Sequence, residues 1–392
     1  MAAASQRLII ILLALAGFAS MASMRITDAM LPALSLEFAR PIADVAQNIT
    51  VFAIAYGLMQ LIYGPLGDRH GALRVISLAS LACAIGTLGT ALADSLATLL
   101  VFRTLNGATA AAIIPLSMAW VGDNVPYEER QVTLIHMLSG TVLGLTAGQL
   151  TGGLLADTLG WQSAFFLLTG MFVVSGTLLL TALRRQPMLV PSRNSTERVT
   201  FLTRLRTILA IAKARHILML VFLEGLAAFG ALAFVASHLH ARLGISLTLA
   251  GMTLALFGVG GLFFAAIARR VVGRLGERRL ASGGGLLMGL GFTGLAWAPL
   301  AEAAMVAAFC AGLGFYMMHS TLQTNATQMA PAARGTAMAI FAGCLFLGQS
   351  VGVSIGGVVL RLADGQWLLT GAGLWLLALG LLFTLRLRQW QR

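Results

Sequence analysis

Charged residues are scarce in this chain: they make up 10% of its 392 residues, and 14 of them are acidic. Soluble domains typically carry about 25% charged residues, so the composition excludes an ordinary water-soluble fold. Hydrophobic residue types make up 58% of the chain, and glycine occurs 44 times. The chain is therefore predicted to lie in a membrane.

Cysteines and catalytic patterns are also scarce. Cys83, Cys310 and Cys344 all lie in apolar runs, so we expect packing roles and no disulfide. We find no metal-ligand set and no phosphate-binding loop, which argues against a metal cofactor and against ATP. Residues 352–356 match the G-x-S-x-G pattern of serine hydrolases, but no histidine follows His319 to act as the base. No enzyme is predicted.

Apolar runs of about 20 residues, the length of a helix that crosses a bilayer, occur twelve times. None shows the two-residue alternation of a membrane barrel. The sequence thus predicts an all-α membrane protein with 12 transmembrane helices. The expected spans are 8–31, 47–66, 74–93, 97–120, 132–155, 163–183, 216–239, 247–267, 281–299, 302–324, 335–360 and 367–385.

The basic residues distribute unevenly over the expected loops. If the N-terminus is cytoplasmic, 21 of the 26 basic residues fall on the inside, Arg40, Arg242 and Arg361 fall outside, and Arg25 and Arg103 lie within spans. The positive-inside rule then predicts cytoplasmic N- and C-termini. It also explains the net charge of +12 without a nucleic-acid partner. A cleavable signal at the N-terminus would break this distribution.

Residues 64–74, GPLGDRHGALR, form a charged, glycine-framed loop between two apolar runs. They resemble the loop signature of the major facilitator superfamily of transporters, G-x-L-[AG]-D-R-x-G-[RK]-[RK]. Ala72 and Leu73 depart from its basic pair, and Arg74 supplies the remaining charge there. The matching residues are Gly64, Leu66, Gly67, Asp68, Arg69 and Gly71.

Two glycine arrays with the spacing G-x-x-x-G-x-x-x-G-G recur 204 residues apart. Small residues at every fourth position let helix backbones approach closely, so packing alone explains each array. Their recurrence indicates two related halves, as the superfamily resemblance also implies. The arrays are Gly144, Gly148, Gly152 and Gly153, followed by Gly348, Gly352, Gly356 and Gly357.

The predicted domains are an N-terminal six-helix bundle over 1–183, a linker over 184–215 and a C-terminal six-helix bundle over 216–392. The linker carries eight basic residues and an apolar stripe that begins near Thr196. We expect an amphipathic helix there, lying on the cytoplasmic lipid surface. A solvated tether is the alternative.

The first glycine array is similar to the fifth-helix signature of the superfamily's antiporters, G-x-x-x-G-P-x-x-G-G. Gln149 occupies the proline position, so an uptake carrier stays open as an alternative to an exporter. Arg103, in FRTLNGATAA, resembles the R-x-x-[QN]-G pattern of the fourth helix. The resemblance implies that this arginine takes part in proton coupling.

Charges inside the membrane indicate function, because each costs about 2.5–3.5 kcal/mol at a helix centre. Arg25 and Asp28 share one face of the first expected span. With Pro32, Asp28 resembles the D-x-x-x-P of multidrug/proton antiporters, which implies that its carboxyl binds protons. A self-neutralising pair at the outer interface is the alternative. Glu224 is the second candidate, and Arg103 is expected to assist either acid.

The resemblance implies that the first, fourth, seventh and tenth helices line a central substrate cavity. Methionine and aromatic side chains there suit lipophilic ligands, although most of these positions would also serve as core. The candidate cavity residues are Met24, Asn106, Met118, Phe229, Phe234, Tyr316, His319 and Gln323.

The loop 64–74 is expected to act as a gate. By the resemblance, Asp68 faces the N-terminus of the helix after Arg334, a favourable site for an anion. Arg69 or Arg74 is expected to pair with Asp123 and to hold the cytoplasmic side closed.

These features predict a monomeric, proton-coupled exporter of the drug/proton antiporter branch in the bacterial cytoplasmic (inner) membrane. Its expected partners are a small amphipathic substrate and membrane lipid, without nucleic acid, and protons replace any cofactor. A proton-coupled or facilitative uptake carrier is the first alternative. A non-transporting sensor or scaffold is the second.

Overall fold

The computed structural model describes residues 3–185, 201–331 and 334–390, and the described residues are almost entirely helical. Ten stretches among them are long and apolar enough to cross a membrane. The first half of the chain contains α1 (Ala3–Arg25), α2 (Leu31–Glu37), α3 (Ile42–Val45), α4 (Gln47–His70), α5 (Ala72–Ala91), α6 (Leu96–Ala110), α7 (Ile113–Asn124), α8 (Tyr127–Thr158) and α9 (Trp161–Arg185).

The second half contains α11 (Ala212–Leu243), α12 (Leu247–Trp297), α13 (Ala301–Gln328), α14 (Arg334–Leu362) and α15 (Gly365–Trp390). The 51-residue α12 joins two expected spans, 247–267 and 281–299, across Gly276. This glycine has φ 68° and ψ 168°, a conformation that ends a regular helix and that glycine adopts without a steric penalty.

Two expected spans are broken where a proline removes a backbone donor. The fourth span, 97–120, consists of α6 and α7 with Ala111 and Ala112 between them, and Pro115 follows in the first turn of α7. The first span, 8–31, ends earlier than expected, at Arg25, because residues 26–30 form turns before Pro32. Asp28 therefore lies in a turn and not in a continuous helix, which corrects the prediction.

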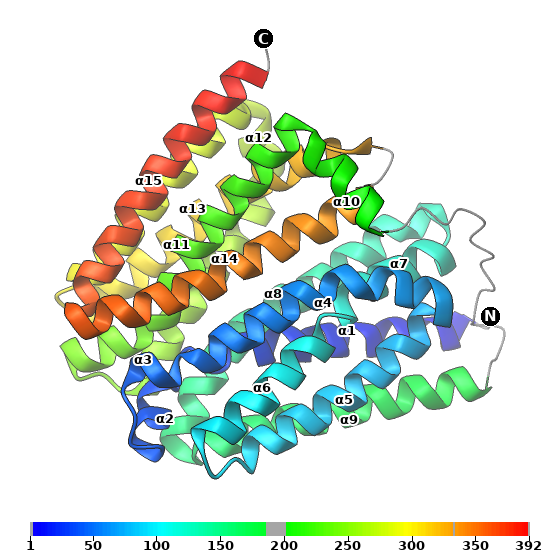
Figure 1. Ribbon diagram of the computed structural model, residues 1–392, viewed down its shortest axis with the longest axis horizontal. Helices are drawn as coiled ribbons and strands as arrows, with labels where there is room; N and C mark the ends of the chain where they lie inside the picture. The colour runs from blue at the N-terminus through cyan, green and yellow to red at the C-terminus, as the bar shows by residue number, and fades with distance from the viewer. Residues whose placement is uncertain (1–2, 186–200, 332–333, 391–392) are drawn as a thin grey trace.

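Long helices run back and forth, so all connections fall at one of two ends of the molecule. We call the end with residues 70–72, 124–127 and 328–331 the terminal end, because both described chain ends lie there. The opposite end, with residues 25–47, 158–161 and 297–301, is the distal end. Figure 1 shows the two halves meeting toward the distal end and diverging toward α10.

Each half buries its own apolar core. One large cluster of buried side chains runs from Ile9 to Leu183, and the other runs from Ile208 to Leu387 and takes in Ala29. A small third cluster joins the halves at the distal end through Leu31, Phe234 and Val353. Exposed leucine, isoleucine and valine side chains on the outer helix faces suit contact with lipid.

The linker helix α10 (Phe201–Ala210) packs on the second half, near α11 and α14. Ile208 is fully buried there and Leu205 packs against the second core cluster. This part of its apolar stripe contacts protein, whereas the sequence predicted contact with lipid. The start of the expected linker helix, near Thr196, lies outside the described residues.

Candidate functional site

Arg25 and Asp28 form a buried ion pair where the two halves meet. The Arg25 Nη1 donates to Asp28 Oδ2 at 3.4 Å, and both side chains are at most 1% exposed. The other carboxylate oxygen of Asp28 has no hydrogen-bond partner among the described residues. A buried ion with unmet hydrogen bonds costs free energy, so this arrangement is typical of a functional site.

The second half of the chain supplies further partners for Arg25. Its Nη2 donates to Gln349 Oε1 of α14 at 3.4 Å. Its guanidinium lies 4.1 Å from the ring centroid of Phe229 on α11, within the range of a cation–π interaction. Arg25 thus binds its own half through Asp28 and the other half through Gln349 and Phe229.

Arg103 lies behind this pair in the first half. It is fully buried, donates from Nη1 to the Ser23 carbonyl at 2.9 Å and stacks on the Phe52 ring at 4.4 Å. Its charge also acts on the Asp28 carboxyl. The structure therefore gathers Arg25, Asp28 and Arg103 in one buried region, with two positive side chains and one carboxyl.

Gln149 also borders the Asp28 carboxyl and interacts with it electrostatically. The side chain is fully buried, and neither amide atom has a partner within hydrogen-bond limits in the described part of the chain. The residue that replaces the antiporter proline thus places an amide beside the candidate proton site. Sequence analysis noted Gln149 only as a departure from a pattern.

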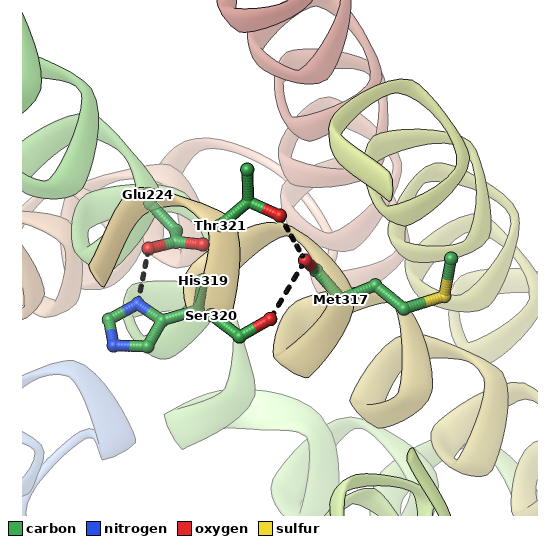
Figure 2. A network of polar contacts seen from close by, with 5 residues as sticks. All are labelled: Glu224, Met317, His319, Ser320 and Thr321. Atoms are coloured by element: carbon green, nitrogen blue, oxygen red, sulfur yellow. Dashed lines mark hydrogen bonds and ion pairs between the residues drawn. The ribbon is translucent and has the colours of Figure 1, made fainter. Parts of the chain in front are cut away.

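A second buried acid lies in the other half. Figure 2 shows Glu224 of α11 directed toward His319 of α13, with Glu224 Oε2 and His319 Nδ1 2.7 Å apart. The Glu224 side chain is fully buried and His319 is 15% exposed. Both residues were predicted separately, one as an acid and one as a cavity residue, and the structure brings them together.

Aromatic rings connect the two buried acids. The His319 ring stacks on Phe315 with centroids 5.0 Å apart, and Phe315 lies 4.9 Å from Phe229. Phe229 in turn carries the Arg25 guanidinium on its face. A chain of aromatic contacts thereby links the Arg25–Asp28 pair to the Glu224–His319 pair.

The glycine arrays form close helix crossings with the same register in both halves. Gly144 and Gly148 press against the backbone of Phe18 and Ala22 in α1, and Gly348 and Gly352 press against Phe222 and Leu226, each 204 residues later. Gly153 and Gly357 instead contact the opposite half, at Leu247 and Ala43 respectively. The internal repeat is therefore a repeat of contacts as well as of sequence.

A family model described as Major Facilitator Superfamily matches residues 13–352 and, separately, residues 217–390. The chain belongs to this superfamily. Superfamily membership makes the protein a multi-pass membrane carrier and not an enzyme. The repeated register and the buried charges are features of this one carrier fold.

Similar proteins include other members of the superfamily. The uncharacterized MFS-type transporter YceJ of Bacillus subtilis is 27% identical over 331 residues, which is 82% of each chain. The multidrug export protein EmrB of Haemophilus influenzae is 28% identical over 160 residues, which is 41% of this chain and 31% of EmrB. The chain is thus similar to less than a third of that exporter.

Solved structures agree with the fold over the whole chain. A bacterial homolog of the human lysosomal transporter Spinster, in an inward-facing and occupied conformation, aligns with a TM-score of 0.82 over 99% of this chain and 98% of that one. The sequence identity is 16%. At that identity the likeness shows the fold alone.

Two polar contacts close the distal end of this superfamily member, and we call them the distal contacts. In one, Arg361 of α14 pairs with Asp44 of α3. In the other, Asp157 of α8 accepts from the Thr248 backbone N–H at 2.6 Å and from its hydroxyl at 2.7 Å, at the start of α12. A carboxylate is stabilised at a helix N-terminus.

The two distal contacts are related by the internal repeat. Arg361 follows Asp157 by 204 residues, and Thr248 follows Asp44 by the same number. From the sequence, only Arg361 was assigned a place, outside the membrane, and none of the four was assigned a role, although applying the glycine offset to the other polar residues would have paired them. Both contacts join the two halves, and so does Arg25–Gln349.

The terminal end lacks the expected gate contacts in this conformation. Asp68, Arg69 and Arg74 are exposed, as is Asp123, and within the described residues none of them forms a hydrogen bond or ion pair. The expected pairing of Arg69 or Arg74 with Asp123 is therefore wrong for this state. Gly71 has φ 85°, which explains why the superfamily loop requires glycine there.

Gly64, in the same loop, also lacks a close neighbour from the second half among the described residues. Within the described part of the chain, a methyl group added to Gly64 would meet no atom within 4 Å, and neither would one added to Gly335 near the start of α14. Gly67, by contrast, packs against Leu116 within the first half. The halves thus contact each other distally and lie apart terminally, which explains why the gate residues have no partners.

The eight candidate cavity residues have different environments. Met118 lines a small apolar hollow between α1, α7 and α8. Phe229, Tyr316 and His319 belong to the aromatic region around Arg25 and Glu224. Gln323 is exposed on α13, one turn beyond His319.

Three of these candidates are packing residues in this conformation, which corrects the prediction that they line a cavity. Met24 is buried in the first core cluster. Asn106 packs against Gly86 and donates to the Ser23 hydroxyl at 2.7 Å. Phe234 lies in the distal cluster beneath Gly356.

Proposed function

We propose that this carrier exports a small amphipathic compound in exchange for protons, as a monomer in the bacterial inner membrane. The chain would cross the membrane twelve times, because α8 adds one crossing to the ten apolar stretches and the two parts of α12 count as two. The terminal end would lie in the cytoplasm, and lipid would surround the apolar faces. The observation that carries the proposal is the buried Arg25–Asp28 pair, which both halves contact.

Alternating access gives this pair its coupling role. Three polar contacts that join the halves, Arg25–Gln349, Asp157–Thr248 and Asp44–Arg361, lie at or near the distal end, so the present conformation corresponds to a carrier open to the cytoplasm. Opening the distal end separates Arg25 from Gln349 and Phe229, because these two belong to the other half. The surroundings of Asp28 then change with each reorientation, as proton exchange requires.

The driving force is adequate for an exporter. An entering proton contributes about 2.3 kcal/mol per 100 mV of membrane potential. At about 1.4 kcal/mol per tenfold gradient, one proton sustains a gradient of tens-fold in a neutral solute. No cofactor besides the proton is required.

Similarity to named exporters supports the direction of transport. The EmrB of H. influenzae is called a multidrug export protein, and the aromatic region beside Arg25 suits ligands with apolar parts. One observation favours the alternative, an uptake carrier: Gln149 stands where antiporters of the superfamily carry proline.

The test uses purified protein in liposomes with an acidic interior and a pH-sensitive dye inside. A panel of ethidium, tetraphenylphosphonium, neutral drugs and common metabolites is added outside. We expect at least one compound to release protons from the lumen, as exchange requires. Proton movement in the same direction as the compound identifies an uptake carrier and contradicts export. If no compound in the panel causes proton movement, the result supports the alternative of a non-transporting sensor or scaffold.

A further inference from the structure

The Glu224–His319 pair differs from an ordinary buried ion pair because each partner can hold the shared proton. Glu224 is fully buried, and its Oε1 has no partner in the described part of the chain. His319 is the titratable side chain that acts on its carboxyl, and no charged side chain from α12, α14 or α15 does so. The pair therefore has no other source of compensating charge.

Charge balance fixes how many protons this pair holds. A carboxylic acid beside a neutral imidazole and a carboxylate beside an imidazolium both have no net charge. Each holds one proton more than a carboxylate beside a neutral imidazole. Removing that proton leaves a buried carboxylate with only a neutral partner, the His319 ring, which is itself flanked by Phe315 and Phe341, and this is costly. That cost favours retention of one proton by the pair.

The pair also has a route for losing that proton. His319 is the partly exposed partner, so the ring connects the buried carboxyl with the surface of α13. Its stacked neighbour Phe315 contacts Phe229, which Arg25 covers only while the distal end is closed. Reorientation of the halves thus changes the surroundings of His319 as well as those of Asp28.

We propose that Glu224 and His319 form a second proton-binding site, so that the carrier moves two protons in each cycle, one in each half. The claim of two protons in each transport cycle rests on the proposed function, but proton binding at this site can be tested without transport. Asp28 with Arg25 serves the first half, and Glu224 with His319 serves the second. The ligand of both sites is the proton.

The test is an infrared difference titration of purified protein in lipid, without any substrate, from alkaline pH down to about pH 5.5, where exposed carboxyls with ordinary pKa values of about 4 stay largely ionised. We expect two protonated carboxyl bands in the wild type, of which Asp28→Asn removes one and Glu224→Gln the other. His319→Gln should leave the Glu224 band in place and change the pH at which it appears. Glu302→Gln, at an exposed glutamate that opens α13, is the matched control and should remove neither band.

A titration spectrum of Glu224→Gln that matches the wild type in both the carboxyl and the imidazole bands overturns the second site, because neither partner of the pair then contributes to the titration. Failure of the proposed function is a separate result: both bands titrate, but no compound moves protons in liposomes. Where transport is found, the ratio of protons to compound should fall from two to one in Glu224→Gln. A ratio of one in the wild type also contradicts the inference.

Discussion

At the scale of single residues, Asp28 is distinguished by its position between two arginines and two halves of the chain. Asp28→Asn keeps the side-chain shape but cannot lose or gain a proton in the physiological range. We expect it to abolish proton-driven transport, to background level, while the protein stays inserted. Arg25 retains Gln349 and Phe229 as partners, which limits the loss of stability.

The measurement is the liposome assay with any compound that moves protons in the wild type, together with gel filtration of the purified variant. Glu302→Gln again serves as the control. Normal proton-driven transport by a folded Asp28→Asn protein would contradict the assignment and direct attention to Glu224.

Gln349 is the residue that ties Arg25 to the other half. Gln349→Leu removes the acceptor for the Arg25 Nη2, and an unmet buried donor costs about 1–3 kcal/mol. Because this contact exists only while the distal end is closed, we expect the population to move toward the distally open state. Gln323→Leu, at an exposed glutamine on α13, should change nothing.

The reporter for this shift is a cysteine at position 29, in a chain whose three native cysteines are replaced by alanine. Ala29 is fully buried and contacts Gly251 of the other half. A membrane-impermeant thiol reagent should label it several-fold faster in Gln349→Leu. Equal labelling rates would show that Arg25–Gln349 does not stabilise the closed distal end.

At the scale of helices, the glycine arrays fix how α8 lies on α1 and how α14 lies on α11. A methyl group at Gly148 would lie 2.5 Å from the Ala22 carbonyl oxygen, and Gly352 is as close to the Leu226 backbone. Backbone cannot move aside as a side chain can. Gly148→Ala and Gly352→Ala should therefore each destabilise the protein by about 1–3 kcal/mol.

Thermal unfolding in detergent measures this effect. Gly170→Ala in α9 is the control, because a methyl group there meets no atom within 4 Å. Alanine also favours the helix over glycine by up to about 1 kcal/mol, so the melting temperature of this variant should equal or exceed that of the wild type. A melting temperature for Gly352→Ala as high as that of Gly170→Ala would show that the array is not a close crossing.

The sequence predicted these crossings, because the periodic glycines indicate both the spacing of close contacts along a helix and their repetition in the second half. The Arg25–Asp28 pair was also predictable, since the two residues are three apart and their side chains meet locally. Glu224 and His319, by contrast, are 95 residues apart and join two helices. No local pattern indicates which faces of α11 and α13 meet, so their contact emerged only from the packing.

Helix ends were predicted less well, for a similar reason. Apolar runs state where helices can cross a membrane, but not where prolines and turns interrupt them. The turns over 26–30 and the break at Ala111 and Ala112 thus changed two expected spans. The predicted gate pairing is not formed in this conformation, because a sequence pattern does not specify which of several conformations holds a contact. It stays a prediction for a state in which the terminal end is closed.

At the scale of the whole molecule, the distal contacts hold the two halves together unequally. Asp157 is exposed as well, but it accepts two hydrogen bonds at the start of α12, one of them from the backbone, and with allowance for solvent the two together contribute about 1–2 kcal/mol. Arg361 and Asp44 are 58% and 33% exposed, and exposed ion pairs contribute about 0–1 kcal/mol. Asp157→Ala should therefore open the distal end more than Arg361→Ala.

Spin labels at Arg40 and Asp364, two exposed distal residues from different halves, report the opening as a longer distance. We expect about a tenfold gain in the open population for Asp157→Ala, as about 1.4 kcal/mol implies, and a gain of less than about fivefold for Arg361→Ala. Added salt should reproduce the small effect of Arg361→Ala in the wild type. The reverse ranking would show that the ion pair is the stronger contact.

The glycine contacts between the halves have one further consequence, for speed. Gly251 meets the Gln149 carbonyl, and Gly57 and Gly343 meet each other's carbonyls, so backbone faces backbone at these crossings. Few side chains at such surfaces have to change rotamer when one half turns over the other. We therefore expect the polar contacts between the halves to make the larger contribution to the activation barrier of reorientation, and their side chains to influence the turnover number of the carrier.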